Sequence, residues 1–520
     1  SMQGISGENV KILIDGVPVV GRLNGNIDLS QINLNDVEQI EVIEGPQSVS
    51  YGTNALAGTI NIITKSDQKK PFELALKSFY ENTGRYNIDG KIGYKHKNHY
   101  LSISGGRNYF DGWNDKDLTF NNGEAIADES RFKQWKPKEQ HFSSLHYNYK
   151  LQKWNLRWKT DLFKEKITNK GLPRAPYLET AFDDYYRTSR FDNSFYANGK
   201  IKNGNSLNFI VAYNQYQRIK NTYYIDLTTL EQQLSTNSGS QDTSKFNQWV
   251  LRGTYAQSKD TATINYQIGY DVNLETAYGR RIANEKQSQG DYALFASAKY
   301  TIQKGLAIQP AFRYGYNTNY RTSLLPSLNL LYKHKKLAFR GSMAKGFRAP
   351  TLKEQYFEFN DSNHNIQGNQ DLDAESSTNY SLGVTLNHLK SSIPIKFDYS
   401  WFYNDINDMI TLAISVDDPT MYTYTNIGNY KTTGSKLDVH LKYSHFKLTV
   451  GAGYIGRYNV LSEMEELKKF NYYPEVRTNI SHIMKKWKIT TSLFVKYQGR
   501  TTGFAIDSEE QVINSFIDAY

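Results

Sequence analysis

Residues 44–64 read EGPQSVSYGTNALAGTINIIT, a stretch in which glycines and other small residues lead into a strand-like run at Gly58–Thr64. The glycines suggest a phosphate-binding loop, but such a loop carries a lysine directly after its glycines. Here the first lysine is Lys65, beyond the strand. Small residues also allow one backbone segment to approach another closely. The stretch therefore predicts a tightly packed segment, and the rest of the sequence must show what it packs against.

After about residue 72 the sequence alternates between apolar and mixed positions. Runs such as 100–106, 154–162, 262–270 and 488–497 each place apolar residues on one face of a strand. Mean hydropathy is low, at −0.64, yet aromatic residues reach 14%, with 40 Tyr and 25 Phe. This combination is typical of membrane strands that face lipid on one side and a polar lumen on the other. Composition alone also permits a large soluble all-β protein.

The links between the predicted strands alternate in length along the chain. Short polar turns fall near 95–99, 150–153, 202–206, 258–261, 303–305, 333–336, 388–392, 443–445 and 484–486, with links of ten or more residues between most of them. Outer-membrane barrels have short turns at one end and long loops at the other. We therefore predict an all-β fold, a large antiparallel transmembrane β-barrel. About nineteen strands are present, and another starts at 512–520.

Several classes of protein are disfavoured by the composition. The chain has no cysteine, which excludes disulfides, thiol nucleophiles and cysteine-based metal sites. No apolar run approaches the ~18 residues of a membrane helix. The net charge is +10, but the longest basic run is 333–336, so nucleic-acid binding is not expected. The motifs of serine hydrolases, P-loop proteins and zinc proteases are missing, so we expect neither an enzyme nor a bound cofactor.

Residues 1–66 differ from the rest of the chain. They contain strand-like runs at 9–20, 34–42 and 58–64. The first of these runs includes an Asp-Gly turn. These runs are too few to bury an independent core of good size. We expect residues 1–66 to be part of a domain that packs inside something larger, and residues 67–520 to form the barrel.

Ordered motifs resemble one known family. LIDGVP at 13–18, NIDLSQ at 26–31, VEQIEVIEGP at 37–46 and the segment 48–64 resemble the plug domain of TonB-dependent outer-membrane receptors. FRAPTLKE at 347–354 and GNQDLDAE at 368–375 resemble the barrel boxes of the same family. The resemblance implies a barrel of the 22-stranded type, with about 19–20 strands present here and a partial plug inside it. The location that it implies is the bacterial outer membrane.

The resemblance also implies a function. Such receptors use energy coupled through TonB to take up a scarce metal chelate, here cobalamin, haem or a ferric siderophore. Outer-membrane lipid would surround the barrel, and family analogy suggests a surface lipoprotein as a further partner. A passive porin, or a structural or adhesive barrel, is the alternative. Ligand identity stays open, since the stretch 26–31 favours cobalamin and a loop histidine, His364, favours haem.

Two departures from the family pattern stand out. The TonB-binding box and the first half of the plug have no counterpart before Ser1, and the last strand-like run, Val512–Tyr520, has no return partner. We therefore expect an internal fragment, truncated at both ends. Secondly, Glu44 occupies a position where the family usually has an arginine that pairs with barrel carboxylates. This leaves open whether an ionic latch joins the plug to the barrel.

Ligand-binding candidates come from two segments. In the turn 21–26, Arg22, Asn24 and Asn26 would donate to a ligand from the apex of the plug, although an ordinary turn also uses such residues. The long link 347–375 supplies the other candidates, which are Tyr356, Phe357, Phe359, Asn360, His364 and Asn365. Loop aromatics such as Trp135 either bind a flat ligand or pack and anchor their loops.

His364 is the one histidine of ten that falls in a long link. A neutral imidazole there would suit the iron of a bound haem. Haem receptors of the family place such a histidine between an FRAP box and an NPDL box, and the second box here reads NQDL, without its proline. The plainer interpretation is a solvated or hydrogen-bonded loop histidine. We expect the protein itself to hold no metal ion.

Overall fold

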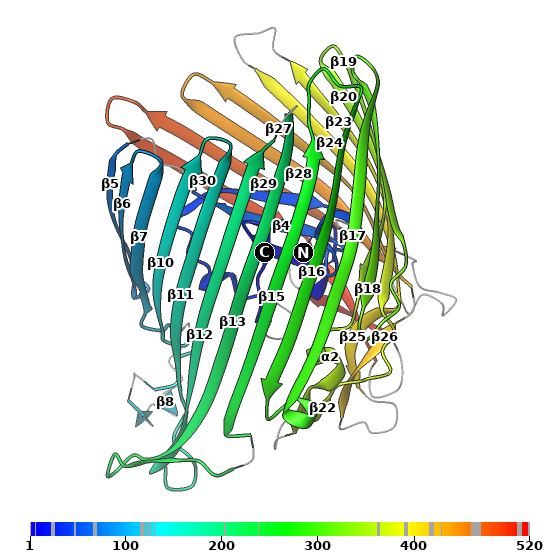
Figure 1. Cartoon of the computed structure of the whole chain (residues 1–520). Coiled ribbons are helices and arrows are strands. Elements are labelled where there is room, and N and C mark those ends of the chain that lie inside the picture. The colour runs from blue at the N-terminus through cyan, green and yellow to red at the C-terminus, as the bar shows by residue number, and fades with distance from the viewer. Residues whose placement is uncertain are drawn as a thin grey trace.

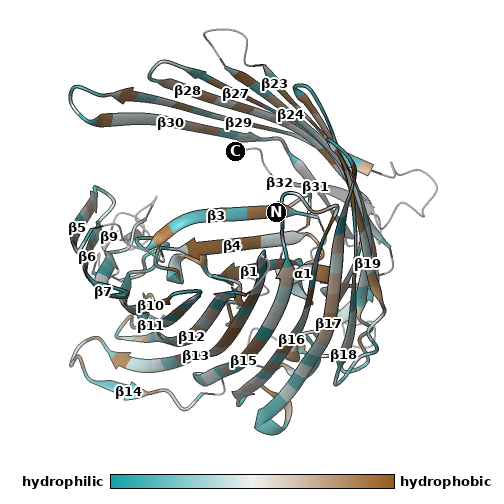
Figure 2. Ribbon diagram, turned by 45° about the horizontal axis from the view of Figure 1, so that its top comes forward, coloured by the Kyte–Doolittle hydropathy of each residue, from teal (hydrophilic) through white to brown (hydrophobic). Residues whose placement is uncertain are grey.

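The structure is a computed structural model that describes residues 2–5, 7–21, 27–45, 48–65, 70–114, 120–121, 124–125, 127–128, 131–201, 204–237, 239–360, 365–388, 394–414, 421–427, 429–458, 470–506 and 512–517. A small N-terminal sheet lies inside a large curved sheet (Figures 1 and 2). We call the described residues up to Lys65 the plug and the large sheet the wall.

The wall contains nineteen long strands within the described residues, and each pairs antiparallel with the next long strand along the chain (Figure 1). The strand order forms a barrel in which β30 returns to β5, and Figure 2 shows these two strands farther apart than other neighbours. The strands are β5 (Phe72–Glu81), β6 (Arg85–His96), β7 (His99–Phe110), β10 (Lys138–Leu151), β11 (Trp154–Lys170), β12 (Thr180–Lys200), β13 (Asn205–Asp226), β15 (Gln241–Gln257), β16 (Ile264–Gly279), β17 (Lys286–Gln303), β18 (Leu306–Asn317), β19 (Leu325–His334), β20 (Leu337–Arg348), β23 (Glu375–His388), β24 (Ile395–Asn407), β27 (Tyr430–Tyr443), β28 (Phe446–Tyr458), β29 (Phe470–Met484) and β30 (Ile489–Gln498).

Burial alternates along many of the wall strands with the period of two that the sequence predicts. On β7, Leu101 and Ile103 are 43% and 56% exposed, whereas Tyr100, Ser102 and Ser104 are buried. The apolar residues therefore face outward and the polar ones inward, against the plug. A soluble protein has the opposite distribution, with apolar residues inside. Apolar residues on the outside are what a barrel surrounded by lipid requires.

The links are sorted by length between the two ends of the wall. Two-residue turns at 97–98, 152–153, 304–305, 335–336 and 444–445 lie at one end, which we call the short-turn end. Links at 111–137, 171–179, 227–240, 349–374 and 408–429 lie at the other, the long-link end (Figure 1). The predicted barrel, its strand number and its alternating loops are confirmed.

The plug is a four-stranded sheet with the order β2-β1-β4-β3. Strand β1 pairs parallel with β4, and β3 pairs antiparallel with β4, so β4 lies in the interior of the sheet. Its elements are η1 (Gly7–Asn9), β1 (Val10–Ile14), β2 (Val17–Pro18), η2 (Leu29–Gln31), β3 (Val37–Glu44), α1 (Ser48–Tyr51) and β4 (Gly58–Thr64). The predicted strands, including the Gly58–Thr64 strand, are found at the expected places.

The glycine-rich stretch packs in the way its small residues predict. Gly52 has φ +79°, and a Cβ there would meet the guanidinium of Arg313 on wall strand β18. Gly58 has φ +148°, and a Cβ there would collide with the carbonyl oxygen of Ile43 on β3. One difference from the expectation is α1, a single helical turn within the stretch, which follows Gly45 at φ +87°.

Smaller elements occupy the long links. They are β8 (Phe120–Asn121), β9 (Glu124–Ala125), β14 (Gln232–Leu234), η4 (Ala283–Glu285), α2 (Leu352–Tyr356), β21 (Glu358–Asn360), β22 (Asn365–Gln367), β25 (Met409–Ile414) and β26 (Tyr422–Ile427). The run after residue 511 was expected to lack a partner, but β31 (Thr501–Ile506) pairs antiparallel with β32 (Val512–Ile517) as a hairpin. Within the described part of the chain, no helix is both long and apolar enough to cross a membrane.

Candidate functional site

Ion pairs hold the plug against the wall, and three plug carboxylates, Asp15, Asp36 and Glu44, take part in them. Asp15, in the turn after β1, lies 3.5 Å from Arg157 and 3.8 Å from Lys159. At the end of β3, the Glu44 carboxylate lies 2.6 Å from the Nζ atom of Lys436 on β27. The question raised by Glu44 is therefore answered: an ionic contact is present, with its two charges exchanged relative to the family pattern.

The third contact joins Asp36 of the plug to strands β6 and β7. Its carboxylate accepts a hydrogen bond of 2.7 Å from the Ser104 hydroxyl and lies 3.0 Å from the Lys91 ammonium. Burial by itself would raise the pKa of Asp36, but the Ser104 hydrogen bond and the charge of Lys91 outweigh it. The pKa of Asp36 is therefore lowered, and the residue stays ionised in its partly buried position.

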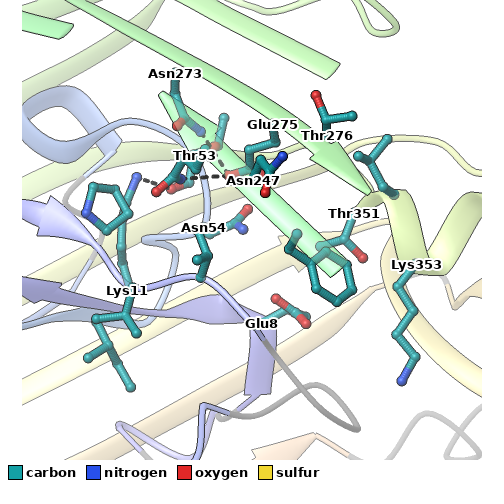
Figure 3. Close-up of a pocket in the computed structure, with 18 residues that line it drawn as sticks. Glu8, Lys11, Thr53, Asn54, Asn247, Asn273, Glu275, Thr276, Thr351 and Lys353 are labelled. Carbon is teal, nitrogen blue, oxygen red and sulfur yellow. Dashed lines mark hydrogen bonds between the residues drawn. The ribbon is translucent and has the colours of Figure 1, made fainter. Parts of the chain in front are cut away.

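A cavity lies where the plug, the wall and the link after β20 meet (Figure 3). It encloses about 810 Å³ of space, part of which is open to solvent. Its lining residues are Glu8, Lys11, Ile12, Pro18, Val19, Val20, Gly21, Thr53, Asn54, Phe246, Asn247, Gln248, Asn273, Glu275, Thr276, Thr351, Leu352 and Lys353.

A row of hydrogen bonds ties the wall side of this cavity to the plug. The Glu275 carboxylate on β16 accepts 2.9 Å bonds from the side-chain amides of Gln248 and Asn273. Asn214 on β13 donates to Gln248 at 3.1 Å and also to the Pro18 carbonyl of the plug at 3.2 Å. The polar wall of the cavity is thus set before a ligand arrives.

Lys11 is the central cation of the cavity. Its Nζ atom donates to the carbonyl oxygen of Tyr51 at 2.6 Å. It also donates to the carbonyl oxygen of Thr53 at 3.0 Å (Figure 3). The Lys11 side chain is largely surrounded by protein and keeps part of its surface toward the cavity. Burial lowers the pKa of Lys11 to about 8, and the charges of Asp271 and other wall carboxylates offset this only in part. The cavity therefore holds a cation whose charge changes near pH 8.

The link after β20 reaches this cavity through α2. Leu352 of α2 packs against Ala277 and Ile282, and Lys353 lines the cavity opposite Glu8 of the plug (Figure 3). Burial lowers the pKa of Lys353, and the charge of Glu8 is the largest opposing influence. One long link therefore covers the plug and contributes a second amine.

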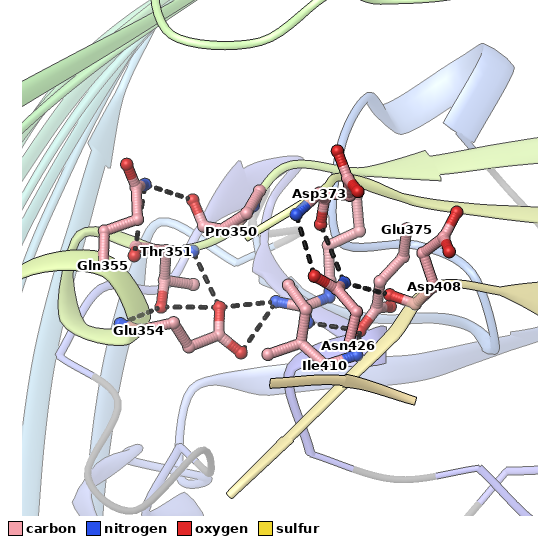
Figure 4. Close-up of polar contacts among 10 residues, drawn as sticks. Pro350, Thr351, Glu354, Gln355, Asp373, Glu375, Asp408, Ile410 and Asn426 are labelled. Carbon is pink, nitrogen blue, oxygen red and sulfur yellow. Dashed lines mark hydrogen bonds and ion pairs between the residues drawn. The ribbon is translucent and has the colours of Figure 1, made fainter. Parts of the chain in front are cut away.

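A buried ionic cluster holds α2 in place. The guanidinium of Arg348, at the end of β20, is 1% exposed and donates to both Glu354 oxygens at 3.1 and 2.8 Å. It also donates to Glu375, at the start of β23. Glu354 closes a capping box with Thr351, whose backbone N–H donates to it at 2.7 Å (Figure 4). We call Arg348, Glu354 and Glu375 the arginine clamp.

The clamp extends to the hairpin β25–β26. The Ile410 backbone N–H donates to Glu375 at 2.7 Å. Asn426 donates to the Asp408 carbonyl at 2.6 Å and to that of Asp373 at 3.1 Å (Figure 4). The two long links after β20 and after β24 are thereby joined to each other on the long-link side of the plug.

A second hollow lies between the plug segment 29–35 and strands β5, β6, β7 and β10. It encloses about 1840 Å³, including open solvent, and its lining combines four cations with aromatic rings. The cations are Lys77, Arg85, Lys136 and Lys138, and the rings belong to Phe79, Tyr109, Phe110 and Trp135. Trp135 also packs against Trp113, with ring centroids 4.8 Å apart. Trp135 therefore packs within its loops and also lines the hollow, so both interpretations of this residue stay open.

The predicted ligand residues fall in different places. Arg22, Asn24, Asn26 and His364 lie outside the described residues. Tyr356 packs with the Leu352 cluster, and Phe357 ends α2 with its ring 4.9 Å from the Lys353 ammonium. Phe359, Asn360 and Asn365 belong to the short ladder β21–β22, at Phe359↔Ile366 and Asn360↔Asn365. The cavity is lined by Thr351, Leu352 and Lys353 just before them. The binding role of the predicted residues stays a prediction.

Among the cavity residues that sequence reasoning missed, Lys11 has a more specific sequence signal than the residues on the wall. Gln248, Asn273 and Glu275 occupy inward positions of β15 and β16, where polar residues are common to every strand. Lys11 interrupts an otherwise apolar plug strand, VKILI, which is the more specific feature. A lysine at such a position implies a polar environment that the strand itself does not supply.

Fold and site together define a plugged β-barrel with a cavity on the long-link side of its plug. Comparison with family models agrees with this description. Residues 77–520 match the model "TonB dependent receptor-like, beta-barrel" and residues 1–59 match the "TonB-dependent Receptor Plug Domain". The chain therefore belongs to the TonB-dependent receptors, a family of bacterial outer-membrane receptors and transporters rather than enzymes, as its motifs predict.

Solved structures share the fold. The ferric enterobactin receptor PfeA from Pseudomonas aeruginosa, in a mutant form, has a TM-score of 0.78 at 16% identity, and the match covers 100% of this chain and 82% of that one. The siderophore receptor PirA from Acinetobacter baumannii has a TM-score of 0.77 at 15% identity, with 100% and 84% coverage. The FrpB iron transporter from Neisseria meningitidis has a TM-score of 0.73 at 13% identity, with 100% and 84% coverage.

Proposed function

We propose that this protein is a TonB-dependent outer-membrane transporter that actively takes up a metal-chelate nutrient. The observation that carries the proposal is the shared cavity, whose lining comes from the plug, the wall and a long link at once. A ligand held there contacts the element that must move for transport. Binding can shift the plug only if the ligand interacts differently with two positions of the plug, and Lys11 and Glu8 are the charged plug groups that would make such a difference.

Among the three ligand classes, the charge distribution favours an anionic, aromatic chelate of the ferric siderophore type. The second hollow presents Lys77, Arg85, Lys136 and Lys138 beside aromatic rings, with Asp89 as the carboxylate of its lining. Cations and ring faces suit a ligand that carries both negative charge and aromatic groups. The names of the structural relatives PirA and PfeA, a siderophore and a ferric enterobactin receptor, agree with this choice.

The earlier candidates remain part of the proposal. Arg22, Asn24 and Asn26 would meet the ligand from the plug, and Asn365 from the long link. His364 would ligate iron only if the ligand were haem. The division between plug and barrel near residue 66, the TonB partner and a surface lipoprotein belong to the same proposal. A passive porin fits less well, because a sheet occupies the lumen.

A binding screen tests the proposal. Full-length receptor is titrated with ferric catecholate and hydroxamate siderophores, haemin and cyanocobalamin, with tryptophan fluorescence as the readout. We expect saturable binding of a siderophore, weakened by Lys11→Met in the shared cavity and by Lys136→Gln with Lys138→Gln in the second hollow. Retained haemin binding that His364→Ala abolishes would reassign the ligand to haem. Absence of binding to every compound, with a large open conductance in planar bilayers, would refute transport in favour of a porin.

A further inference from the structure

A group of basic side chains lies on the outer face of the wall, away from the plug and both cavities. His141 on β10, Lys164 and Lys166 on β11 and Arg187 on β12 are neighbours in the strand register. His141 is opposite Lys164, and Lys166 is opposite Arg187. We call these four residues the outer basic patch.

The alternation of burial fixes the direction of these side chains. Phe163 and Glu165, which flank Lys164 on β11, are buried, as is Thr188 beside Arg187 on β12. All four patch residues are exposed. Since neighbouring positions on a strand point to opposite faces, the patch faces the surroundings of the barrel rather than its lumen.

The patch begins where the apolar outer surface ends. Along β11 the outward positions run from Trp158 and Leu162, 46% and 50% exposed, to Lys164 and Lys166. Phe195 continues the apolar surface on β12. Lys164 lies about 7 Å beyond Leu162 toward the long-link end, from a strand rise of roughly 3.3 Å per residue. Because long loops of such barrels are extracellular, this level corresponds to the headgroups of the outer leaflet.

The positive charges of the patch favour the binding of an anion. Like charges placed directly opposite on neighbouring strands destabilise a sheet, and Lys166 faces Arg187 in this way. Both cations also flank the ring of Tyr185, at 5.1 and 5.8 Å from its centroid. The carboxylate beside them, Glu139, is engaged by Arg107 at 2.7 Å and by His141 at 3.3 Å. Glu139 therefore leaves the cationic character of the patch largely intact.

A shallow hollow lies over these side chains. It encloses about 630 Å³, including open solvent, and its outward lining residues are Glu139, His141, Lys164, Lys166, Arg187, Ser189, Gln217 and Ile219. We propose that the outer basic patch binds the phosphate groups of a phosphorylated glycolipid of the outer leaflet. Arg187 and the two lysines would pair with phosphate oxygens, while Leu162 and Trp158 would contact the acyl chains. This inference does not depend on which nutrient the barrel transports.

The test compares two variants with equal change of charge. In the patch variant, Lys164→Gln, Lys166→Gln and Arg187→Gln are combined. The matched control combines Lys304→Gln, Lys485→Gln and Lys486→Gln, three exposed turn residues at the short-turn end. Full-length protein in neutral detergent is titrated with bisphosphorylated lipid A and with the same lipid after removal of both phosphates. Native mass spectrometry measures the bound lipid.

We expect the patch variant to bind the bisphosphorylated lipid about tenfold more weakly than the wild type and the control, which is the loss of three solvent-accessible charge pairs. The dephosphorylated lipid should bind all three proteins equally and more weakly. Equal affinity of patch and control variants, or unchanged affinity without phosphates, would overturn the proposal. Should the triple variant fail to fold, Lys164→Gln alone should weaken binding about twofold, and an unchanged affinity would again overturn it.

Discussion

Replacing the arginine of the clamp gives the sharpest test of how the long links are held. In Arg348→Met, a buried cation is lost and two buried carboxylates, Glu354 and Glu375, stay behind. Both carboxylates keep other donors, since Thr351 donates to Glu354 and the Ile410 N–H donates to Glu375. Breaking a buried ion pair from one side costs about 3–5 kcal/mol, and these remaining donors place the cost near the lower end, about 3 kcal/mol.

Because the clamp connects links rather than wall strands, the cost should appear as local opening. Hydrogen exchange with mass spectrometry would follow the amides of 350–357 and 409–414. A loss of about 3 kcal/mol raises exchange through local opening roughly a hundredfold, while the wall strands should keep their protection. Arg340→Met is the matched control, because Arg340 lies on the same strand, is exposed and donates one bond to Thr385.

A compensated variant checks the physical reason. Combining Arg348→Met with Glu354→Gln and Glu375→Gln removes the uncompensated charges and should recover much of the protection, since a glutamine can still complete the capping box. Ligand affinity should follow the same order, because α2 carries Lys353 to the cavity. Equal exchange at 350–357 in Arg348→Met and Arg340→Met would refute the clamp, and so would a compensated variant that opens more than the single one.

Three further predictions concern the plug. Glu44→Lys should weaken retention of the plug by up to about 1 kcal/mol, as expected for a partly exposed pair, and adding Lys436→Glu should restore it, measured by proteolytic release in a double-mutant cycle. Because the pKa of Asp36 is lowered, its contribution to the stability of the plug is present above its unfolded pKa and is lost as pH falls through the lower folded value. Protection of the plug from proteolysis should therefore drop below about pH 4. The variant Asp36→Asn should lack this acid-dependent loss. For Lys11 the pKa is lowered to about 8, so its charge is lost as pH rises through that value; affinity for an anionic ligand should fall between pH 7 and 9, and Lys11→Met should bind weakly at both. The same lowering implies that the Lys11 contribution to folding stability rises from pH 8 toward 10.5, which denaturation at both pH values would check.

Features that repeat with the period of a strand can be predicted from the sequence. The outward direction of Leu101 and Ile103 is predicted from the neighbouring residues alone. The lengths of the links follow from where the alternation stops. The plug motifs and the Gly58–Thr64 strand are equally local. Such information lies within a few residues, so the barrel, its strand number and its family follow without tertiary structure.

The pairing of charges needed the folded chain. Glu44 and Lys436 are hundreds of residues apart, and their ionic contact depends on how the plug is seated rather than on any local pattern. The same holds for Lys11, whose pKa depends first on its burial and then on charges from the wall, among them carboxylates of β16 and β17. It also holds for Arg348, whose FRAP motif identifies the family but not its two partners.

The difference lies in the range of the forces. Alternation records which face of a strand meets lipid, and every residue carries that information for itself. Cavity composition and salt bridges record which strands become neighbours and how deeply a side chain is buried, and burial decides whether a charge is costly or useful. The stretch at 44–64 shows both: its small residues predict close packing, and the fold alone reveals that the acid at its start meets a lysine on β27.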